Sequence, residues 1–260
     1  MSAADTLTYI YDGSYEGMLC CVFETYAAHE MPIAVLLPEA EEMPLFGTKE
    51  IVTEEAKARR VQKGMREKLG AEVAELVRLS YFTCLPEKEL WVIRFLHLAF
   101  RTGKRVTRLV AEPSVDKLTK AVQSLMGEAH LLKGFVRFSV QQEVLVSTIG
   151  PKNFVLPFLA AHFRARYPRE HFLIYDEKHH MALVSRPQEF AIVPMADFTA
   201  GTPDDEERRC RQLWRGFYEA IEIKPRHNER CRMTHLPKRY WKYMTEFAAE
   251  DTGGQLKCIH

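Results

Sequence analysis

The chain has 260 residues, of which 47% are hydrophobic, and its formal net charge is +1. This length and composition fit a globular protein with one large hydrophobic core or two smaller ones. No apolar run reaches the roughly 20 residues that a membrane helix needs, and the first residues lack the basic and then apolar pattern of a signal peptide. We therefore expect a cytoplasmic protein that has no membrane partner.

The cysteines do not follow the spacing of a metal site. Six of them are present, and none forms a CxxC pair. Zinc ribbons and iron-sulfur clusters use such closely spaced pairs. We expect reduced and mostly buried thiols, no bound metal and no cofactor.

The charges are unevenly distributed along the chain. Residues 1–56 contain eleven acidic residues and one lysine, whereas residues 208–242 contain eleven basic residues and three acidic ones. Three interpretations remain open: the two ends pack on each other or on a partner, the basic end binds a polyanion such as nucleic acid, or both are solvated surfaces.

The N-terminal segment predicts a strand, a turn and a helix. Residues 7–11 are β-branched and aromatic, and Asp12-Gly13 is a strong turn signal. Ser14 is well placed to cap the helix that follows. The backbone N–H groups at this helix start suit an anion, but any strand-to-helix junction looks the same, and we favour plain structure. Asp12 either caps the helix or is a carboxylate at a pocket rim. A second strand is predicted at residues 33–37.

A basic helix is predicted next. Thr53 is a suitable N-cap, two glutamates follow it, and Gly70 ends the helix. Six lysines and arginines lie between residues 57 and 68. Such a helix can lie along a phosphate backbone, although a solvated surface is the commoner explanation.

Three further helices complete a helical subdomain over about residues 54–133. Two are amphipathic or apolar, at residues 73–81 and 86–100, and the last begins at Pro113. Its apolar residues are spaced by three and four and form one stripe: Val115, Leu118, Val122, Leu125, Ala129 and Leu132.

The period of the apolar residues falls to two at Phe135. Gly134 lies at the change and is predicted to end the helix in the left-handed conformation. Around this corner cluster Glu128, His130, Lys133 and Arg137. Because His130 and Lys133 share a helix face, they would suit an anionic partner. A half-buried histidine bonded to a carbonyl is the alternative.

The second half of the chain predicts a sheet. Alternating segments at residues 135–140, 143–149, 171–176, 181–185 and 190–193 indicate strands. The first two form a hairpin across Gln141-Gln142, and the last three form a meander. Between them a helix is predicted to start near Pro151–Pro157 with Asn153 as its cap, and another helix starts at Asp204.

These elements predict an α+β fold, with a mostly helical first half, an antiparallel sheet in the second half, and closing C-terminal helices. We expect residues 1–200 to form a single domain. Residues 201–260 are predicted to form a basic helical segment packed on it.

No strong catalytic signature is present in the sequence. Motifs of the types GxSxG, GxxxxGK[ST], HExxH and GxGxxG are absent. The candidates for an acid or base are Asp12, His130 and Asp176. Two adjacent histidines, His179 and His180, seldom chelate a metal alone.

The basic tail is the more distinctive feature. It combines cations that neutralise phosphates with rings on which a base can stack. Together with the corner, it gives the candidate nucleic-acid-binding residues: His130, Lys133, Arg137, Arg226, Arg230, Lys238, Arg239, Tyr240 and Trp241. The alternative is that Tyr240 and Trp241 anchor a terminal helix on the core.

Five motifs together resemble a known bacterial family. They are YDGSYEGMLC at 11–20, ExHxxKGFxRF at 128–138, LPxxxxHF at 156–163, YDE at 175–177 and LPKRYW at 236–241. The family is a domain of unknown function labelled a probable DNA metabolism or repair protein. Its members occur alone, beside a radical-SAM protein proposed to modify or repair DNA, or fused to a uracil-DNA-glycosylase-like domain.

The resemblance covers nearly the whole chain and departs from the family pattern at Leu236, where methionine is expected. It implies DNA and a radical-SAM enzyme as partners, and it supplies no catalytic residues. Because the chain has no cluster-binding cysteines, any radical chemistry would belong to the partner.

Three functions follow for testing. The leading hypothesis is an accessory protein that binds DNA, the radical-SAM partner or both. The second is an enzyme that acts on a nucleobase or phosphodiester, which requires the candidate acids and bases to converge on one pocket. The third is a structural interaction module without nucleic-acid binding.

Overall fold

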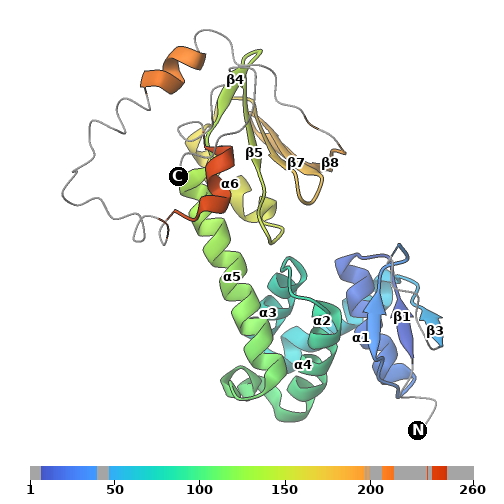
Figure 1. The fold of residues 1–260 in the computed structure, drawn as a ribbon. Coiled ribbons are helices and arrows are strands. Elements are labelled where there is room, and N and C mark those ends of the chain that lie inside the picture. The colour runs from blue at the N-terminus through green and yellow to red at the C-terminus, as the bar shows by residue number, and fades with distance from the viewer. Residues whose placement is uncertain are drawn as a thin grey trace. The chain divides into compact units, whose positions relative to one another are not determined.

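The computed structural model describes residues 7–39, 47–196, 198, 207–213, 233 and 236–244 (Figure 1). It divides into two compact units, Met1–Met126 and Gly127–His260. The predicted α+β fold is confirmed, with helices mostly in the first half and a largely antiparallel sheet in the second. The domain boundary expected at residue 200 lies outside the described residues and stays a prediction.

The first unit begins with a small parallel sheet in the order β2-β1-β3. Strands β1 (Thr8–Ile10) and β2 (Ala34–Leu36) confirm the two predicted strands, whereas β3 (Thr48–Glu50) was not predicted because its residues are polar. Helix α1 (Tyr15–Ala27) provides the crossover that the parallel pair β1–β2 needs. Ser14 caps it as expected, since its Oγ accepts a bond from the Gly17 N–H at 2.9 Å.

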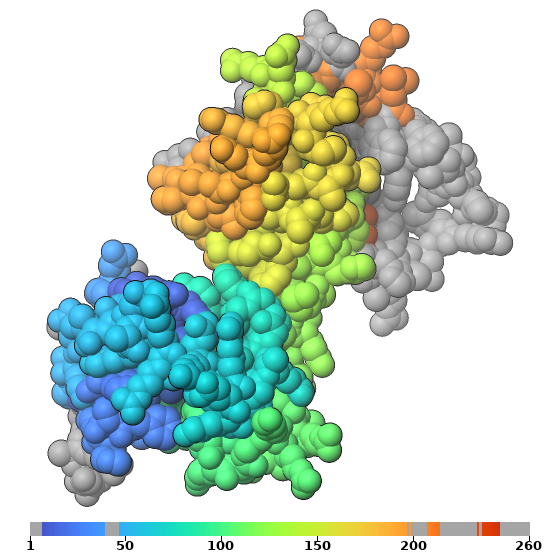
Figure 2. Space-filling view, turned by 180° about the vertical axis from the view of Figure 1, so that it is seen from behind, coloured from blue at the N-terminus to red at the C-terminus, as the bar shows by residue number. Residues whose placement is uncertain are grey.

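A chain of helices follows: α2 (Glu55–Gly64), the π-helical turn η2 (Met65–Leu69), α3 (Ala71–Tyr81), α4 (Lys88–Thr102) and the 3₁₀ turn η3 (Gly103–Arg108). Gly70, with φ of 92°, ends η2 as predicted. The N-cap of α2 is Glu54 and not Thr53. In the space-filling view, the cyan atoms of this region cover one face of the first unit (Figure 2).

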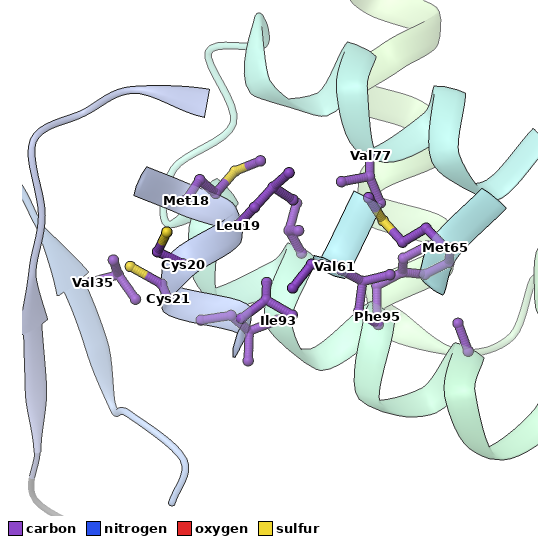
Figure 3. Packing of buried hydrophobic residues seen from close by; sticks show 14 of the residues in the cluster. Met18, Leu19, Cys20, Cys21, Val35, Val61, Met65, Val77, Ile93 and Phe95 are labelled. Carbon is purple, nitrogen blue, oxygen red and sulfur yellow. The ribbon is translucent and has the colours of Figure 1, made fainter. Parts of the chain in front are cut away.

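The core of the first unit lies where α1 meets the helices that follow it. Met18 and Leu19 of α1 belong to one cluster of buried side chains with Met65, Ile93 and Phe95, which Figure 3 draws close together. These five side chains are at most 1% exposed. Burying each such residue stabilises the fold by about 1.5–3 kcal/mol. Helix α4 contributes Ile93 and Phe95 to this core and buries further apolar side chains on several of its faces.

Helix α5 (Pro113–Phe135) begins at the predicted proline and buries most of the predicted stripe. It does not end at Gly134 in the left-handed conformation, so that prediction is wrong. The helix continues to Phe135, whose ring lies 5.6 Å from that of Tyr240.

The sheet of the second unit has the order β4-β5-β6-β7-β8. Its strands are β4 (Ser139–Gln141), β5 (Val144–Ile149), β6 (Phe172–Asp176), β7 (Met181–Arg186) and β8 (Glu189–Pro194). The predicted hairpin is confirmed, and its turn residues Gln142 and Glu143 both have positive φ, as a tight two-residue turn requires. The predicted meander of β6, β7 and β8 is also confirmed.

One pair of strands corrects the antiparallel prediction. Strands β5 and β6 run parallel, and α6 (Leu156–Arg166) is the crossover between them. The N-cap of α6 is Val155, with Pro157 in the first turn, so Asn153 does not cap it. This arrangement brings the carboxyl ends of β5 and β6 side by side.

The last described segments are short. Residues 207–213 are helical, and η5 (Lys238–Tyr243) is a 3₁₀ turn where a helix was predicted. In Figure 1, the red η5 lies beside the end of the green α5. Within the described ranges, every helix is too short or too polar to cross a membrane.

Candidate functional site

The candidate site is the edge where the parallel strands β5 and β6 end. Ile149 pairs with Asp176 at this edge, and the Glu177 N–H donates to the Ile149 carbonyl at 3.0 Å. Ligands of sheets with parallel strands bind beyond the carboxyl ends of those strands. We define the β5–β6 edge as residues 150–154, 176–180 and 238–243.

A buried carboxylate on α5 lies beneath this edge. The side chain of Glu128 is 2% exposed, although it belongs to a helix that ends near the surface. Its oxygens accept bonds from the backbone N–H groups of Lys152 (3.0 and 3.1 Å) and Asn153 (2.8 Å) and from Asn153 Nδ2 (2.8 Å). Asn153 is therefore a partner of Glu128 and not a helix cap.

Two donors from the distant chain end complete the shell of Glu128. The Tyr240 hydroxyl donates to Oε1 at 3.0 Å, and the Arg239 guanidinium lies 3.2 Å from the same oxygen. Burial alone would raise the pKa of Glu128, but the bonds from Lys152, Asn153 and Tyr240 outweigh it and lower the pKa below its usual value. The carboxylate is thus ionised at neutral pH and holds η5 on α5.

A second carboxylate fixes the other end of η5. Glu177 accepts from the Lys242 ammonium at 2.6 Å and from the Tyr243 hydroxyl. Burial raises the pKa of Glu177, and these two bonds outweigh it, so its pKa is also lowered. A Cβ at Gly150 would overlap the Tyr243 hydroxyl, which requires glycine where β5 ends.

The edge also contains an oriented histidine. Asp176 is fully buried, and its Oδ2 lies 2.7 Å from Nδ1 of His179. Its Oδ1 accepts from the backbone N–H groups of Lys178 (3.1 Å) and His179 (3.3 Å). When Nδ1 donates to the carboxylate, Nε2 of a neutral His179 is left as a proton acceptor. The ring packs edge-on against Phe154, with centroids 5.4 Å apart.

Three lysines give the edge its free positive charge. Lys152, Lys178 and Lys238 are exposed, and none forms an ion pair with another described residue. Lys238 Nζ lies 5.7 Å from the centroid of the half-buried Trp241 ring. The carboxylates Glu128, Asp176 and Glu177 are each occupied by donors, so the edge presents cations outward.

A family model matches the chain over residues 86–246, and the family is described as a domain of unknown function, DUF4130. The chain belongs to the DUF4130 family. The match contains Glu128, the whole β5–β6 edge and four of the five motifs that carry the resemblance. No curated protein and no solved structure matches the chain.

Of the three predicted acids or bases, Asp12 belongs to the first unit, and His130 and Asp176 belong to the second. The Oδ1 of Asp12 accepts from the Ser14 N–H (2.9 Å) and hydroxyl (2.7 Å). Ser14 is the N-cap of α1, so Asp12 does not cap the helix itself but holds the capping residue in place. His130 is exposed on α5 and forms no hydrogen bond with Asp176, whose partner is His179.

The described candidates for nucleic-acid contact lie at the end of α5 and on η5, and the rings of Phe135 and Tyr240, 5.6 Å apart, bring these two segments together. Lys133 is half-buried, and Arg137 donates to the Gly134 carbonyl at 2.7 Å. Tyr240 is 1% exposed, so its ring anchors η5 and is not accessible for stacking on a base. Arg226 and Arg230 lie outside the described residues.

Several site residues of the DUF4130 domain were not predicted from sequence. The sequence locates Glu128 at the corner but does not mark it as a site residue, although it interrupts the apolar stripe between Leu125 and Leu132. A carboxylate in a buried stripe signals a polar partner in the interior. The order strand, helix, strand could also have indicated a parallel pair and its ligand edge.

Proposed function

We propose that this DUF4130 protein is a DNA-associated accessory protein whose β5–β6 edge binds the phosphate backbone. The observation that carries the proposal is the bonding of Glu128 to Tyr240 and Arg239, because it fixes η5 at the strand ends. Lys238 is thereby held on the same edge as the exposed Lys152 and Lys178. The resemblance to a family labelled a DNA metabolism or repair protein supports the same function.

The charges at the edge favour backbone binding over sequence reading. Lysine ammonium groups contact phosphates as point charges, and each contact releases condensed counterions. The half-buried Trp241 offers part of a ring beside Lys238, which suits a single strand or an extruded base. We therefore expect binding that depends strongly on salt and weakly on sequence.

Fluorescence anisotropy with labelled single-stranded, double-stranded and uracil-containing DNA at low salt tests the proposal. The test variant is Lys152→Ala/Lys178→Ala/Lys238→Ala, for which each lost phosphate contact lowers the salt slope by about 0.9 on duplex DNA. The matched control is Lys63→Ala/Lys104→Ala/Lys120→Ala, which removes equal charge from exposed lysines of the first unit. Equal losses in both variants, or no binding to any of the three DNAs, would overturn the proposal.

Arg239 is a poor test of DNA binding, because its guanidinium bonds to Glu128 at 3.2 Å. A charge reversal there would place two carboxylates together and disturb η5. The exposed lysines avoid this confusion.

The resemblance also supports a radical-SAM enzyme as the partner. The chain would then deliver or hold DNA while the partner performs the radical chemistry. Analytical ultracentrifugation of the purified chain with that enzyme, with and without DNA, measures the complex directly. The absence of a complex under both conditions would remove the partner from the proposal. DNA binding would then be tested by the anisotropy experiment alone.

A second candidate function is supported by the Asp176–His179 pair. A histidine held by a buried carboxylate at 2.7 Å has the geometry of a general base, which would suit an enzyme acting on a nucleobase or phosphodiester. Denaturing gels of uracil-containing and undamaged oligonucleotides would report cleavage or base loss. His179→Ala should abolish it and His180→Ala should not, since His180 lies outside this pair and bonds to the Ala196 carbonyl. Equal activity of both variants would refute the assignment.

A further inference from the structure

A groove in the first unit has no role in the proposed function. It lies between α1 and the α2–η2 segment, is closed by Phe100 of α4, and has a volume of about 630 Å³. All its lining residues except Phe100 precede residue 86, where the DUF4130 match begins. Its volume falls within the roughly 300–1,000 Å³ that is usual for small-molecule sites.

The walls of the groove combine aromatic rings with cations. Phe23, Tyr26 and Phe100 supply the rings, and the Arg60 guanidinium lies 5.7 Å from the Phe23 centroid. Lys68 is the second cation, and no acidic residue is among those that line the groove. Eight residues separate the two cations, which corresponds to about 12 Å along a helix. The groove therefore has an apolar floor between two positive charges.

The segment that carries Lys68 has an unusual backbone. Residues Met65–Leu69 form a π-helical turn, closed by the Gly70 N–H to the Met65 carbonyl at 3.0 Å. Such turns are rare and frequently occur at functional sites. This turn buries Met65 and Leu69 on one side and leaves Lys68 exposed at the groove.

Gly64 keeps the floor of the groove open. A Cβ at this position would lie 3.8 Å from Cζ of Phe100, which is an ordinary contact. An alanine would therefore fit, whereas a longer side chain would extend into the space between α1 and α2. Gly64→Leu can therefore serve as a variant that blocks the groove, and Gly64→Ala as its control.

We propose that this groove binds a small anion with a planar aromatic body, the class that includes nucleotides and aromatic carboxylates. The ring packs against Phe23, Tyr26 and Phe100, and the acidic group pairs with Arg60 or Lys68. Arginine and aromatic side chains both stack on planar ligands, and the absence of lining acids favours negative charge. The site is independent of the β5–β6 edge and of DNA binding.

Fluorescence titration with 8-anilinonaphthalene-1-sulfonate, an aromatic anion, tests the site on the full chain. The uncharged N-phenyl-1-naphthylamine serves as the comparison probe and should bind at least about tenfold more weakly, because it lacks the group that pairs with the cations. Displacement of the anionic probe by adenosine monophosphate identifies a nucleotide site, and displacement by 2-naphthoate alone identifies an aromatic carboxylate site. Failure of both competitors would overturn the proposal.

Matched variants locate the binding. Arg60→Gln/Lys68→Gln should weaken the anionic probe about tenfold, as expected for two exposed charge pairs. Arg59→Gln/Lys63→Gln removes equal charge from the same helix outside the groove and should change affinity less than twofold.

The blocking variant separates the groove from general surface charge. Gly64→Leu should abolish binding while Gly64→Ala retains it, with circular dichroism confirming that both fold. If Gly64→Leu is folded and binds normally, or if both charge variants weaken the probe equally, the groove is not the site. Displacement of the probe only by acidic peptides would also overturn the small-anion proposal.

Discussion

Replacing Glu128 tests the central contact of the second unit. Glu128→Gln keeps one oxygen for the two bonds from Asn153, and it places an amide nitrogen where Arg239 and Tyr240 now donate. Tyr240 can rotate its hydroxyl to accept, but a guanidinium cannot accept. Arg239 is 42% exposed, so its guanidinium can bind water instead. The variant therefore loses mainly the extra strength that the negative charge of Glu128 gives to its hydrogen bonds. We expect a loss of about 2 kcal/mol in the free energy of unfolding.

Glu128→Ala should cost more. It leaves the Asn153 N–H, the Asn153 side chain and the Tyr240 hydroxyl without their acceptor in a buried site. Removing one partner of such a buried network costs about 4 kcal/mol, which corresponds to roughly 8–16 °C in melting temperature for a chain of this size.

Urea unfolding followed by circular dichroism and tryptophan fluorescence measures both changes. Glu170→Gln is the matched control, because Glu170 is exposed in the same unit and should change stability by less than about 0.5 kcal/mol. A double-mutant cycle with Tyr240→Phe isolates the contact between the two residues. If Glu128→Gln were as harmless as the control, or if the cycle showed no coupling, the tethering of η5 by Glu128 would be refuted.

Four further predictions follow from the same contacts. The pKa of Glu128 is lowered in the folded protein, so its stabilisation is complete above the unfolded value of about 4.3 and is lost as pH falls through the folded value; urea midpoints from pH 7 to pH 3 should fall less in Glu128→Gln. Gly64→Ala should stabilise the chain by about 0.5–1 kcal/mol, measured by urea unfolding. Gly17→Ala should cost about 2 kcal/mol, because its Cβ would overlap Asp12 Oδ1 and lie 2.7 Å from Thr53 Oγ1. Iodoacetamide should label the exposed Cys84 before the buried Cys21, whose thiol pKa is raised by burial and by the neighbouring Cys20, as measured by peptide mass spectrometry.

Each of these predictions has a contradicting result. Equal acid sensitivity of wild type and Glu128→Gln would show that other groups control the pH dependence. Gly64→Ala and Gly17→Ala serve as controls for each other. If both stabilised or both destabilised the chain, the explanation from the space around each Cβ would be contradicted. Labelling of Cys21 as fast as Cys84 in the folded chain would show that α1 opens readily to solvent.

Local signals predicted the elements that depend on near neighbours. Ser14 caps α1 because Gly17 is three residues away, and Pro113 starts α5 because its missing N–H has no partner there in any case. The β4–β5 hairpin needs only the two residues of its turn. Gly134 shows the limit of such signals, because the helix continues through it to Phe135, and Gly134 does not take a positive φ.

The site depends on contacts that no local pattern reports. Glu128 meets Asn153 at a separation of 25 residues and Tyr240 at a separation of 112. The sequence shows cations and rings in the tail. It does not show that Tyr240 is buried and that its hydroxyl donates to Glu128 on α5. Likewise, Asp176 was identified as an acid, whereas its pairing with His179 depends on the turn that follows β6.

The start of the DUF4130 match has a practical consequence for truncation. Residue 86 lies just before α4, and α4 turns Ile93 and Phe95, both fully buried, into the core of the first unit. A recombinant fragment cut at that residue would expose this apolar side to water and should self-associate. The start of the family match and the start of the compact unit differ, so we expect soluble expression to require the N-terminal sheet and α1 as well.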